Sequence, residues 1–297
     1  MKKVLVTGNL GYVGSVLVPE LQKHRYEVIG FDIGYFKNCL ISKIYKNKKI
    51  KQIFKDIRKA NLNDFNNIDY VVHLAALSND PLGELKKKNT YEINFNATVN
   101  LAKLAKKLGI KKFIYISTQS IYGVSDHHKE IRENGRKKPI TAYAKSKYLA
   151  EKAIKKLKSK KFHILILRPS TVFGPSPRFR SDIIVNNFIG SAIVEKKINI
   201  LSDGTPWRPA VHINDLCKII VRSLKLNILP FNGQAVNVGY KYGNFTVLEL
   251  AKKISKIFKG IEICHSNKPK LDQRTYKVNF DKLYSIFGKN IDRKSVV

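Results

Sequence analysis

The sequence predicts an α/β protein with a doubly wound parallel sheet of the Rossmann type and a smaller α/β lobe after it. Two observations predict this fold class. Short apolar runs rich in β-branched residues alternate with longer stretches that have apolar residues at helical spacing, and three glycines follow the first apolar run. The chain has 297 residues, which is enough to bury one large core and a second, smaller one.

The expected elements alternate from the amino terminus. Strands are expected at the apolar runs 2–7, 27–32, 70–74, 112–117 and 163–168. Helices are expected at 14–23, 89–108 and 141–158, where apolar residues recur every three or four positions. Each of these helices lies between two expected strands, as a doubly wound parallel sheet requires.

The rhythm of the sequence changes at residue 169. Prolines stand at 169, 175, 177, 206, 209 and 230, among irregular apolar segments. Such spacing is typical of shorter elements and longer loops. We therefore expect residues 1–168 to form a dinucleotide-binding domain that carries the catalytic residues. Residues 169–297 are expected to form mainly a second lobe, with some segments returning to the first body.

The net charge of +34 raises the possibility of a nucleic-acid partner. The distribution of charge argues against one. Lysine supplies 45 of the 56 basic residues, scattered over the whole chain, and arginine, which makes the forked contacts to phosphates and bases, supplies only 11. The lysines are therefore interpreted mainly as solvated surface, although they would steer a polyanionic substrate inward.

Other features favour a cytoplasmic protein without a membrane segment. No run approaches the roughly 18 apolar residues of a membrane span, and the charged start leads directly into a strand. Cys39, Cys217 and Cys264 are odd in number and widely spaced, so they indicate neither a disulfide framework nor a metal site. We expect three ordinary thiols in a reducing compartment.

The segment TGNLGYVG at 7–14 is the first motif with chemical content. Gly8 allows a sharp turn off the strand, Gly11 allows the backbone to approach a pyrophosphate, and Gly14 allows close packing of the helix on the sheet. Asp32 ends the second strand, where a carboxylate accepts both hydroxyls of an adenosine ribose and repels a 2′-phosphate. This pattern favours NAD over NADP, although Asp32 is also compatible with a simple turn beside Gly34.

A tyrosine four residues before a lysine is the second motif. It occurs three times, as Tyr45/Lys49, Tyr143/Lys147 and Tyr148/Lys152, and chance alone explains about two such matches at this composition. Only Tyr143 and Lys147 follow, by one loop, a strand that ends in hydroxyl side chains. Because they begin a predicted helix, their side chains project from one face, next to the sheet edge where such folds hold ligands.

The charges of Lys147 and of an oxidised nicotinamide together are sufficient to turn Tyr143 into a base. A phenol with a pKa near 10 must lose about three units to act near pH 7, which is about 4 kcal/mol. One cation about 4 Å away, at an effective dielectric constant of about 20, contributes about 4 kcal/mol. Lys147 together with an oxidised nicotinamide therefore makes the proposed base energetically reasonable.

Four segments taken together, 8–14, 117–123, 143–147 and 167–174, resemble the extended short-chain dehydrogenase/reductase family, and within it the nucleotide-sugar epimerase/dehydratase branch. The resemblance covers nearly the whole chain. It implies that Tyr143 is the base and that Lys147 holds the nicotinamide ribose and lowers the Tyr143 pKa. It also implies that Thr118 bonds the reacting sugar hydroxyl, and that the chain forms a homodimer through the helices expected at 89–108 and 141–158.

The same resemblance implies a set of NAD-binding residues. Asp56 and Ile57 would meet the adenine, Asn94 would support the active site, and Pro169 would lie near the carboxamide. The full set is Gly8, Gly11, Tyr12, Val13, Gly14, Asp32, Asp56, Ile57, Leu74, Ala75, Ala76, Asn94, Tyr143, Lys147 and Pro169.

The resemblance extends into the second lobe, where it implies a nucleotide-sugar site. Arg208, in the segment 203–212, would clamp the diphosphate, and a forked guanidinium suits phosphate by geometry as well as by charge. Arg274 would be a second clamp and Asn187 would meet the diphosphate or the sugar. Thr171 occupies the place of a sugar-contacting asparagine in many galactose epimerases. Trp207 and His212 are equally compatible with structural roles.

The type of reaction is predicted from positions at which this sequence differs from other members of the branch. The 4,6-dehydratases typically carry an acidic pair after the active-site threonine, but Gln119 and Ser120 stand here and neither titrates near neutral pH. We therefore expect an NDP-hexose 4-epimerase that acts through a transient 4-keto sugar. A one-way NDP-sugar dehydrogenase or a 4-keto-sugar reductase is the alternative, followed by a dehydratase. A non-catalytic NAD sensor or a nucleic-acid-binding module comes last.

Overall fold

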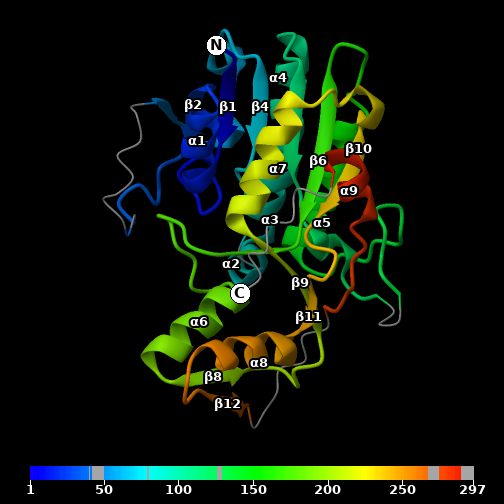
Figure 1. Ribbon diagram of the computed structural model, residues 1–297. Helices are drawn as coiled ribbons and strands as arrows, with labels where there is room; N and C mark the ends of the chain where they lie inside the picture. The colour runs from blue at the N-terminus through cyan, green and yellow to red at the C-terminus, as the bar shows by residue number, and fades with distance from the viewer. Residues whose placement is uncertain (40, 42–49, 79, 126–128, 267–273, 289–297) are drawn as a thin grey trace.

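The computed structural model describes residues 1–39, 41, 50–78, 80–125, 129–266 and 274–288. Figure 1 shows a large body built on one twisted sheet, with a smaller lobe below it that contains α6 and α8. Tyr45/Lys49, one of the three tyrosine and lysine pairs, lies outside the described residues.

The main sheet has seven parallel strands in the order β10-β6-β5-β4-β1-β2-β3. The strands are β1 (Lys3–Thr7), β2 (Glu27–Asp32), β3 (Lys51–Phe54), β4 (Tyr70–His73), β5 (Lys112–Ile116), β6 (His163–Pro169) and β10 (Gln234–Val238). The five predicted strands are confirmed to within one residue at each end, and so is the fold class. The chain reverses direction in the strand order between β1 and β4, which creates the crevice where doubly wound sheets bind ligands.

Helices cover both faces of this sheet. One face carries α1 (Gly14–Lys23), α7 (Ile213–Lys225) and α9 (Asp281–Phe287), and the other carries α4 (Ala97–Lys107) and α5 (Ala142–Lys155). Successive strand residues point to opposite faces, so Val4 and Val6 pack in the α1/α7 core while Leu5 packs in the α4/α5 core. Burial on both faces explains why these strands are continuous apolar runs.

The helix expected at 89–108 is interrupted by a wider turn. The structure has α3 (Lys87–Tyr91), then a π-helical turn at Glu92–Asn96, then α4. The short helix α2 (Asp80–Leu85) precedes them. A π turn re-aims side chains within a helix and is frequent at functional sites, and this one contains Asn94.

The smaller lobe combines two small sheets and two helices. Strands β7 (Thr171–Phe173), β9 (Trp207–His212) and β11 (Asn244–Thr246) form one sheet, and β8 (Lys197–Ile200) pairs with β12 (Glu262–His265). Helices α6 (Ile184–Val194) and α8 (Val247–Ile257) pack on them around a third apolar core. Residues after 169 thus contribute both to this lobe and, through β10, α7 and α9, to the main body.

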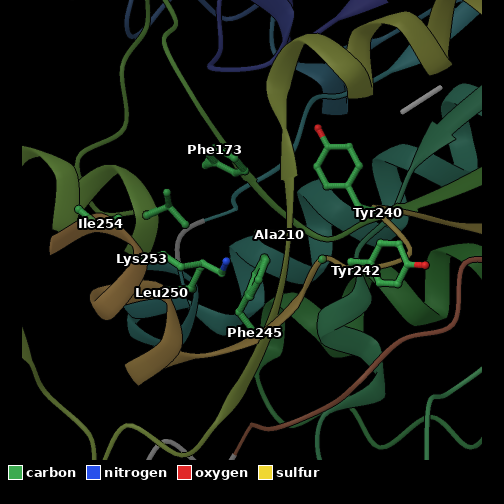
Figure 2. A pocket seen from close by; sticks show the side chains of 10 residues that line it. Phe173, Ala210, Tyr240, Tyr242, Phe245, Leu250, Lys253 and Ile254 are labelled. Carbon is green, nitrogen blue, oxygen red and sulfur yellow. The ribbon is translucent and has the colours of Figure 1, made fainter. Parts of the chain in front are cut away.

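The core of the lobe contains an apolar cavity of about 70 Å³. Figure 2 shows it between β9, β11 and α8, with Phe173, Ala210, Phe245 and Leu250 around it. This volume is far below the roughly 300 Å³ or more of a typical ligand site, so the cavity is not the place of a nucleotide sugar. Among the described residues, no helix has the length and apolar character needed to cross a membrane.

Candidate active site

The glycine turn after β1 forms a cradle that only glycine fits. Gly8 has a φ of +73°, and a Cβ added there would lie 2.8 Å from the backbone nitrogen of Ala75. A Cβ at Gly14 would lie 2.2 Å from the carbonyl oxygen of Gly8. The turn therefore packs directly against the 74–76 segment, at the amino end of α1. Such an open, close-approach backbone at a helix N-terminus fits a pyrophosphate.

A buried hydrogen-bond chain holds β1, β4 and α4 together below this cradle. The Thr7 hydroxyl lies 2.6 Å from His73 Nδ1, and His73 Nε2 lies 2.7 Å from the Thr98 hydroxyl. The Thr98 hydroxyl also donates to the backbone carbonyl of Asn94. Burial lowers the His73 pKa well below its usual value, and the charge of Lys147 adds to this shift. His73 is therefore a neutral structural link, which the sequence did not predict.

Asp32 and Asp56 lie on adjacent strand ends at the same edge of the sheet. The Asp32 carboxylate accepts from the backbone nitrogens of Gly34 at 2.8 Å and Leu10 at 3.2 Å, so it is tied to the glycine turn. The Asp56 carboxylate accepts a forked bond from Arg58 at 2.6–3.1 Å, which holds its pKa below the usual value. Two carboxylates at the ends of β2 and β3 suit the adenosine half of a dinucleotide.

Tyr12 connects the two parts of the protein through its side chain. Its hydroxyl donates to the carbonyl of Gly174 at 2.7 Å and accepts from Asn186 at 3.1 Å, and burial raises its pKa to about 12. Only the backbone of Tyr12 is therefore open to a cofactor. Asn186 is buried at this junction, whereas Asn187, the predicted substrate residue, is exposed on α6.

The helix α5 presents Tyr143 and Lys147 one turn apart. Thr141 caps this helix, its hydroxyl accepting from the Ala144 nitrogen at 3.2 Å. Lys147 is only 3% exposed, and its ammonium donates to the carbonyl of Ile116 at 2.8 Å, at the carboxyl end of β5. Burial lowers the Lys147 pKa to about 7, with partial opposition from the Glu151 carboxylate. Thr118, the predicted sugar-contacting hydroxyl, follows two residues after Ile116.

Asn94 connects the 74–77 segment to the helix α5. Its side-chain oxygen accepts from the Leu77 nitrogen at 2.8 Å, and its amide donates to the Leu77 carbonyl at 3.0 Å and to the Ser146 hydroxyl at 3.3 Å. The π turn aims Asn94 at these partners. The structure thus places Asn94 as a support between two predicted cofactor segments.

Gln119, the residue after Thr118, turns toward β6. Gln119 is buried, and its amide donates to the Arg168 carbonyl at 3.0 Å, while its oxygen accepts from Ser170 at 3.1 Å. Gln119 is therefore a link to β6 and not a group that faces a substrate. Pro169 is buried at the end of β6, and Thr171 is half-buried in the adjoining strand β7.

Arg208 and Arg274 lie together in the second lobe. Arg208 Nη1 donates to the backbone carbonyls of Arg274 and of Trp207, the latter at 2.8 Å. The side chain of Arg208 is mostly buried on β9, and Arg274 is half-buried. Two positions 66 residues apart in sequence therefore meet. These are the two arginines that the sequence analysis assigned to a diphosphate.

Comparison with known proteins now decides the family. The sequence model of the NAD dependent epimerase/dehydratase family matches residues 4–239. The chain belongs to this family. The predicted resemblance is thereby confirmed, as is the expectation of an NAD-dependent enzyme.

Individual members of the epimerase/dehydratase family carry different activities. The chain is 29% identical over 267 residues to the dTDP-D-glucose 4,6-dehydratase of Bos taurus, covering 87% of this chain and 73% of that protein. It is 32% identical over 248 residues to an uncharacterized UDP-glucose epimerase, YtcB, of Bacillus subtilis, covering 80% and 76%. A solved UDP-glucuronic acid 4-epimerase from Bacillus cereus, in complex with UDP-glucuronic acid and NAD, has a TM-score of 0.84 at 25% identity, covering 99% of this chain and 95% of that one.

Arg180, which the sequence analysis did not single out, lies next to Ser78, just after the 74–77 segment. Its Nη1 donates to the Ser78 hydroxyl at 3.0 Å, and the rest of its fork binds Asp182. Burial opposes its charge, but the Asp182 carboxylate outweighs burial and raises the Arg180 pKa, with smaller contributions from Tyr143 and Tyr12. Arg180, paired with Asp182, thus lies within electrostatic range of Tyr143. The one sequence signal that could have pointed to Arg180 is the rarity of arginine, with only 11 in the chain.

Proposed function

We propose that this chain is an NAD-dependent nucleotide-sugar epimerase that acts at C4 through a transient 4-keto sugar. The observation that carries the proposal is the placement of Lys147. Lys147 lies one helical turn after Tyr143, and its buried ammonium donates to the carbonyl of Ile116 at the carboxyl end of β5, two residues before Thr118 in the chain. The glycine cradle lies on the same edge of the parallel sheet.

NAD fits the residues at this edge. The cradle of Gly8, Gly11 and Gly14 would receive the pyrophosphate, and Asp32 would accept from the adenosine ribose. The segment Leu74–Ala76, with Asn94 behind it, would line the cofactor path. When bound, oxidised NAD accepts a hydride from the sugar carbon and returns it to the opposite face of the keto sugar.

The acid–base work belongs to Tyr143. Its phenolate would take the C4 hydroxyl proton as the C4–H bond breaks, and would return that proton as the new C4–H bond forms. When Lys147 is protonated, its positive charge stabilises the Tyr143 phenolate. Burial lowers the Lys147 pKa to about 7, and a phenolate on Tyr143 would favour the ammonium form and raise that pKa. Thr118 would hold the reacting hydroxyl, and the Arg180–Asp182 ion pair lies within electrostatic range of Tyr143.

The second lobe would bind the nucleotide diphosphate. Arg208 is held by the backbone carbonyls of Trp207 and Arg274, so little freedom of the Arg208 side chain is lost when it binds a diphosphate. Thr171 and Asn187 would contact the sugar or the diphosphate from β7 and α6.

Epimerisation is favoured over dehydration by the residues next to Thr118. Elimination of water needs a titrating acid and base near the sugar. The side-chain amide of Gln119 is hydrogen-bonded to the Arg168 carbonyl and to the Ser170 hydroxyl, and Ser120 does not titrate near neutral pH. A relative named as a 4,6-dehydratase and a solved 4-epimerase are both similar to the chain, so the product of the reaction has to decide.

We further propose a homodimer that pairs α4 and α5 of two copies. Support comes from apolar side chains left exposed on α5 and on its neighbour α2: Leu149 on α5 is 37% exposed, and Leu85 at the end of α2, which contacts α5, is 78% exposed. Light scattering at micromolar concentration should give twice the mass of the 33.9 kDa chain. A monomer under these conditions would contradict the proposed pairing.

The decisive experiment combines product analysis with cofactor redox state. The purified protein, supplied with NAD, is incubated with UDP, GDP, CDP and dTDP sugars, and products are identified by NMR while NADH absorbance is recorded. An epimerase converts one sugar to its C4 epimer without net NADH. Accumulation of NADH would indicate a dehydrogenase, and a 4-keto-6-deoxy product would indicate a dehydratase.

A further inference from the structure

A second cavity, of about 410 Å³, lies on the α5 side of the main sheet. Its walls come from α5, β6, the edge strand β10, α9 and the loop 133–137. None of the residues assigned above to NAD or to the nucleotide sugar lines it. Its volume lies in the range of about 300–1,000 Å³ that is usual for small-molecule sites.

The wall of this cavity carries an excess of positive charge. Four lysines line it: Lys137, Lys152, Lys155 and Lys282. Within the described parts of the chain, none of these four ammonium groups forms an ion pair. Lys282 donates to the backbone carbonyl of Ala235 at 2.8 Å, which holds its ammonium at the wall beside β10.

The two carboxylates of the cavity do not balance this charge. Glu151 is already paired with Arg168 at 2.6 Å, with both side chains 5% exposed. Nη1 of Arg168 donates to the Tyr122 hydroxyl and to the carbonyl of Glu133. The Arg168–Glu151 pair is therefore neutral as a unit. Glu133 is the second carboxylate of the wall, and one of its oxygens already accepts from the Asn237 nitrogen.

Desolvation and repulsion distinguish two of these four lysines from the solvated lysines elsewhere on the chain, whereas Lys152 and Lys155 are exposed. Lys137 and Lys282 are half-buried. Burial lowers the pKa of both lysines, and the charges of Arg168 and Lys155 add to the shift. Glu133 opposes the shift at both lysines, and Glu151 also opposes it at Lys137. A bound anion would relieve this repulsion and replace lost hydration with direct contacts. The arrangement is thus complementary to a compact, multiply charged anion.

We propose that this cavity binds a small anion that carries phosphate groups, held by Lys137, Lys155 and Lys282. Phosphate oxygens offer several acceptors within a small volume, which suits ammonium groups converging from a loop, α5 and α9. The aromatic ring of Tyr148 forms part of the wall and leaves room for an organic portion. The inference does not depend on the proposed epimerase activity.

Isothermal titration at about 150 mM NaCl, where the screening length is about 8 Å, tests the site. Pyrophosphate is the inorganic probe and fructose 1,6-bisphosphate is the sugar-phosphate probe. The probe that binds more tightly indicates whether the ligand is an inorganic phosphate or a sugar phosphate. The wild-type protein should show a defined site. The double variant Lys137→Gln/Lys155→Gln should weaken that site at least about tenfold, because it removes two of the converging cations.

A charge-matched control separates this site from diffuse binding to a basic protein. Lys252→Gln/Lys256→Gln removes the same charge from exposed positions on α8, and it should bind like the wild type. If the double variant unfolds at a lower temperature than the wild type, the single variant Lys155→Gln, at an exposed position, should still show a smaller loss of affinity. Equal affinity in the cavity pair and the control pair, or no binding of either probe to the wild type, would overturn the proposal.

Discussion

The ammonium nitrogen of Lys147 lies 4.8 Å from the centre of the Tyr115 ring. Tyr115 is fully buried, two residues before Ser117 on the strand that leads to Thr118, and its ring stacks on His73 with centroids 5.6 Å apart. The negative face of the ring favours the charged form of a lysine that burial would otherwise discharge. Tyr115 is thus a positioning residue for Lys147.

Replacement of Tyr115 by leucine should lower the Lys147 pKa further, because the ring face is lost and desolvation remains. The alkaline limb of the pH–activity profile should move down by about one pH unit, since the cation–π contact of a desolvated ammonium is worth about 1–2 kcal/mol. Tyr115→Phe keeps the ring and should keep the profile. An unchanged profile in the leucine variant, with only reduced stability, would show that the contact is structural.

Tyr143→Phe should lower kcat by about 10²–10⁴-fold, because the acid–base group is removed while the shape of the site is kept. Bound dinucleotide, measured by fluorescence, should be retained. The matched control is Tyr148→Phe, from the second tyrosine and lysine pair on the same helix, which should leave kcat within about twofold. Comparable losses in both variants would remove Tyr143 from its proposed role.

Lys147 makes stability depend on pH with a definite sign. Its folded pKa of about 7 lies below the usual value of 10.5, so the unfolded chain binds more protons than the folded chain between these values. The free energy of unfolding of the wild type, relative to Lys147→Met, should therefore rise with pH from about 7 toward 10.5, on the order of a few kcal/mol. Urea denaturation at several pH values measures this difference, and parallel curves for the two proteins would contradict it.

Gly14→Ala should damage the cofactor cradle. The new Cβ would lie 2.2 Å from the Gly8 carbonyl oxygen, so the turn has to shift, and we expect a loss of about 1–3 kcal/mol of stability together with weaker NAD binding. Gly190→Ala is the control, because its Cβ would meet nothing within 4 Å in the middle of α6. That variant should gain about 0.5–1 kcal/mol from helix propensity. Thermal unfolding and dinucleotide titration check both.

The sequence predicted five of the seven strands of the main sheet because these strands are apolar on both faces. It missed β3, whose two end residues are exposed, and β10, which pairs with β6 although about 65 residues separate them. Tyr143 and Lys147 could be placed on one helix face from their spacing alone. Asn186 was missed in favour of Asn187 because no local rule distinguishes which of two adjacent amides turns inward.

The sequence by itself determined the doubly wound sheet, the glycine turn and the helical spacing of Tyr143 and Lys147, since each depends on backbone preferences and apolar periodicity within a few residues. Only the tertiary structure decided that Lys147 is buried against Ile116, that Arg168 meets Glu151, and that four lysines converge on one cavity. Charge states and ligand sites depend on which distant segments exclude water from a side chain, and local sequence carries no information on that.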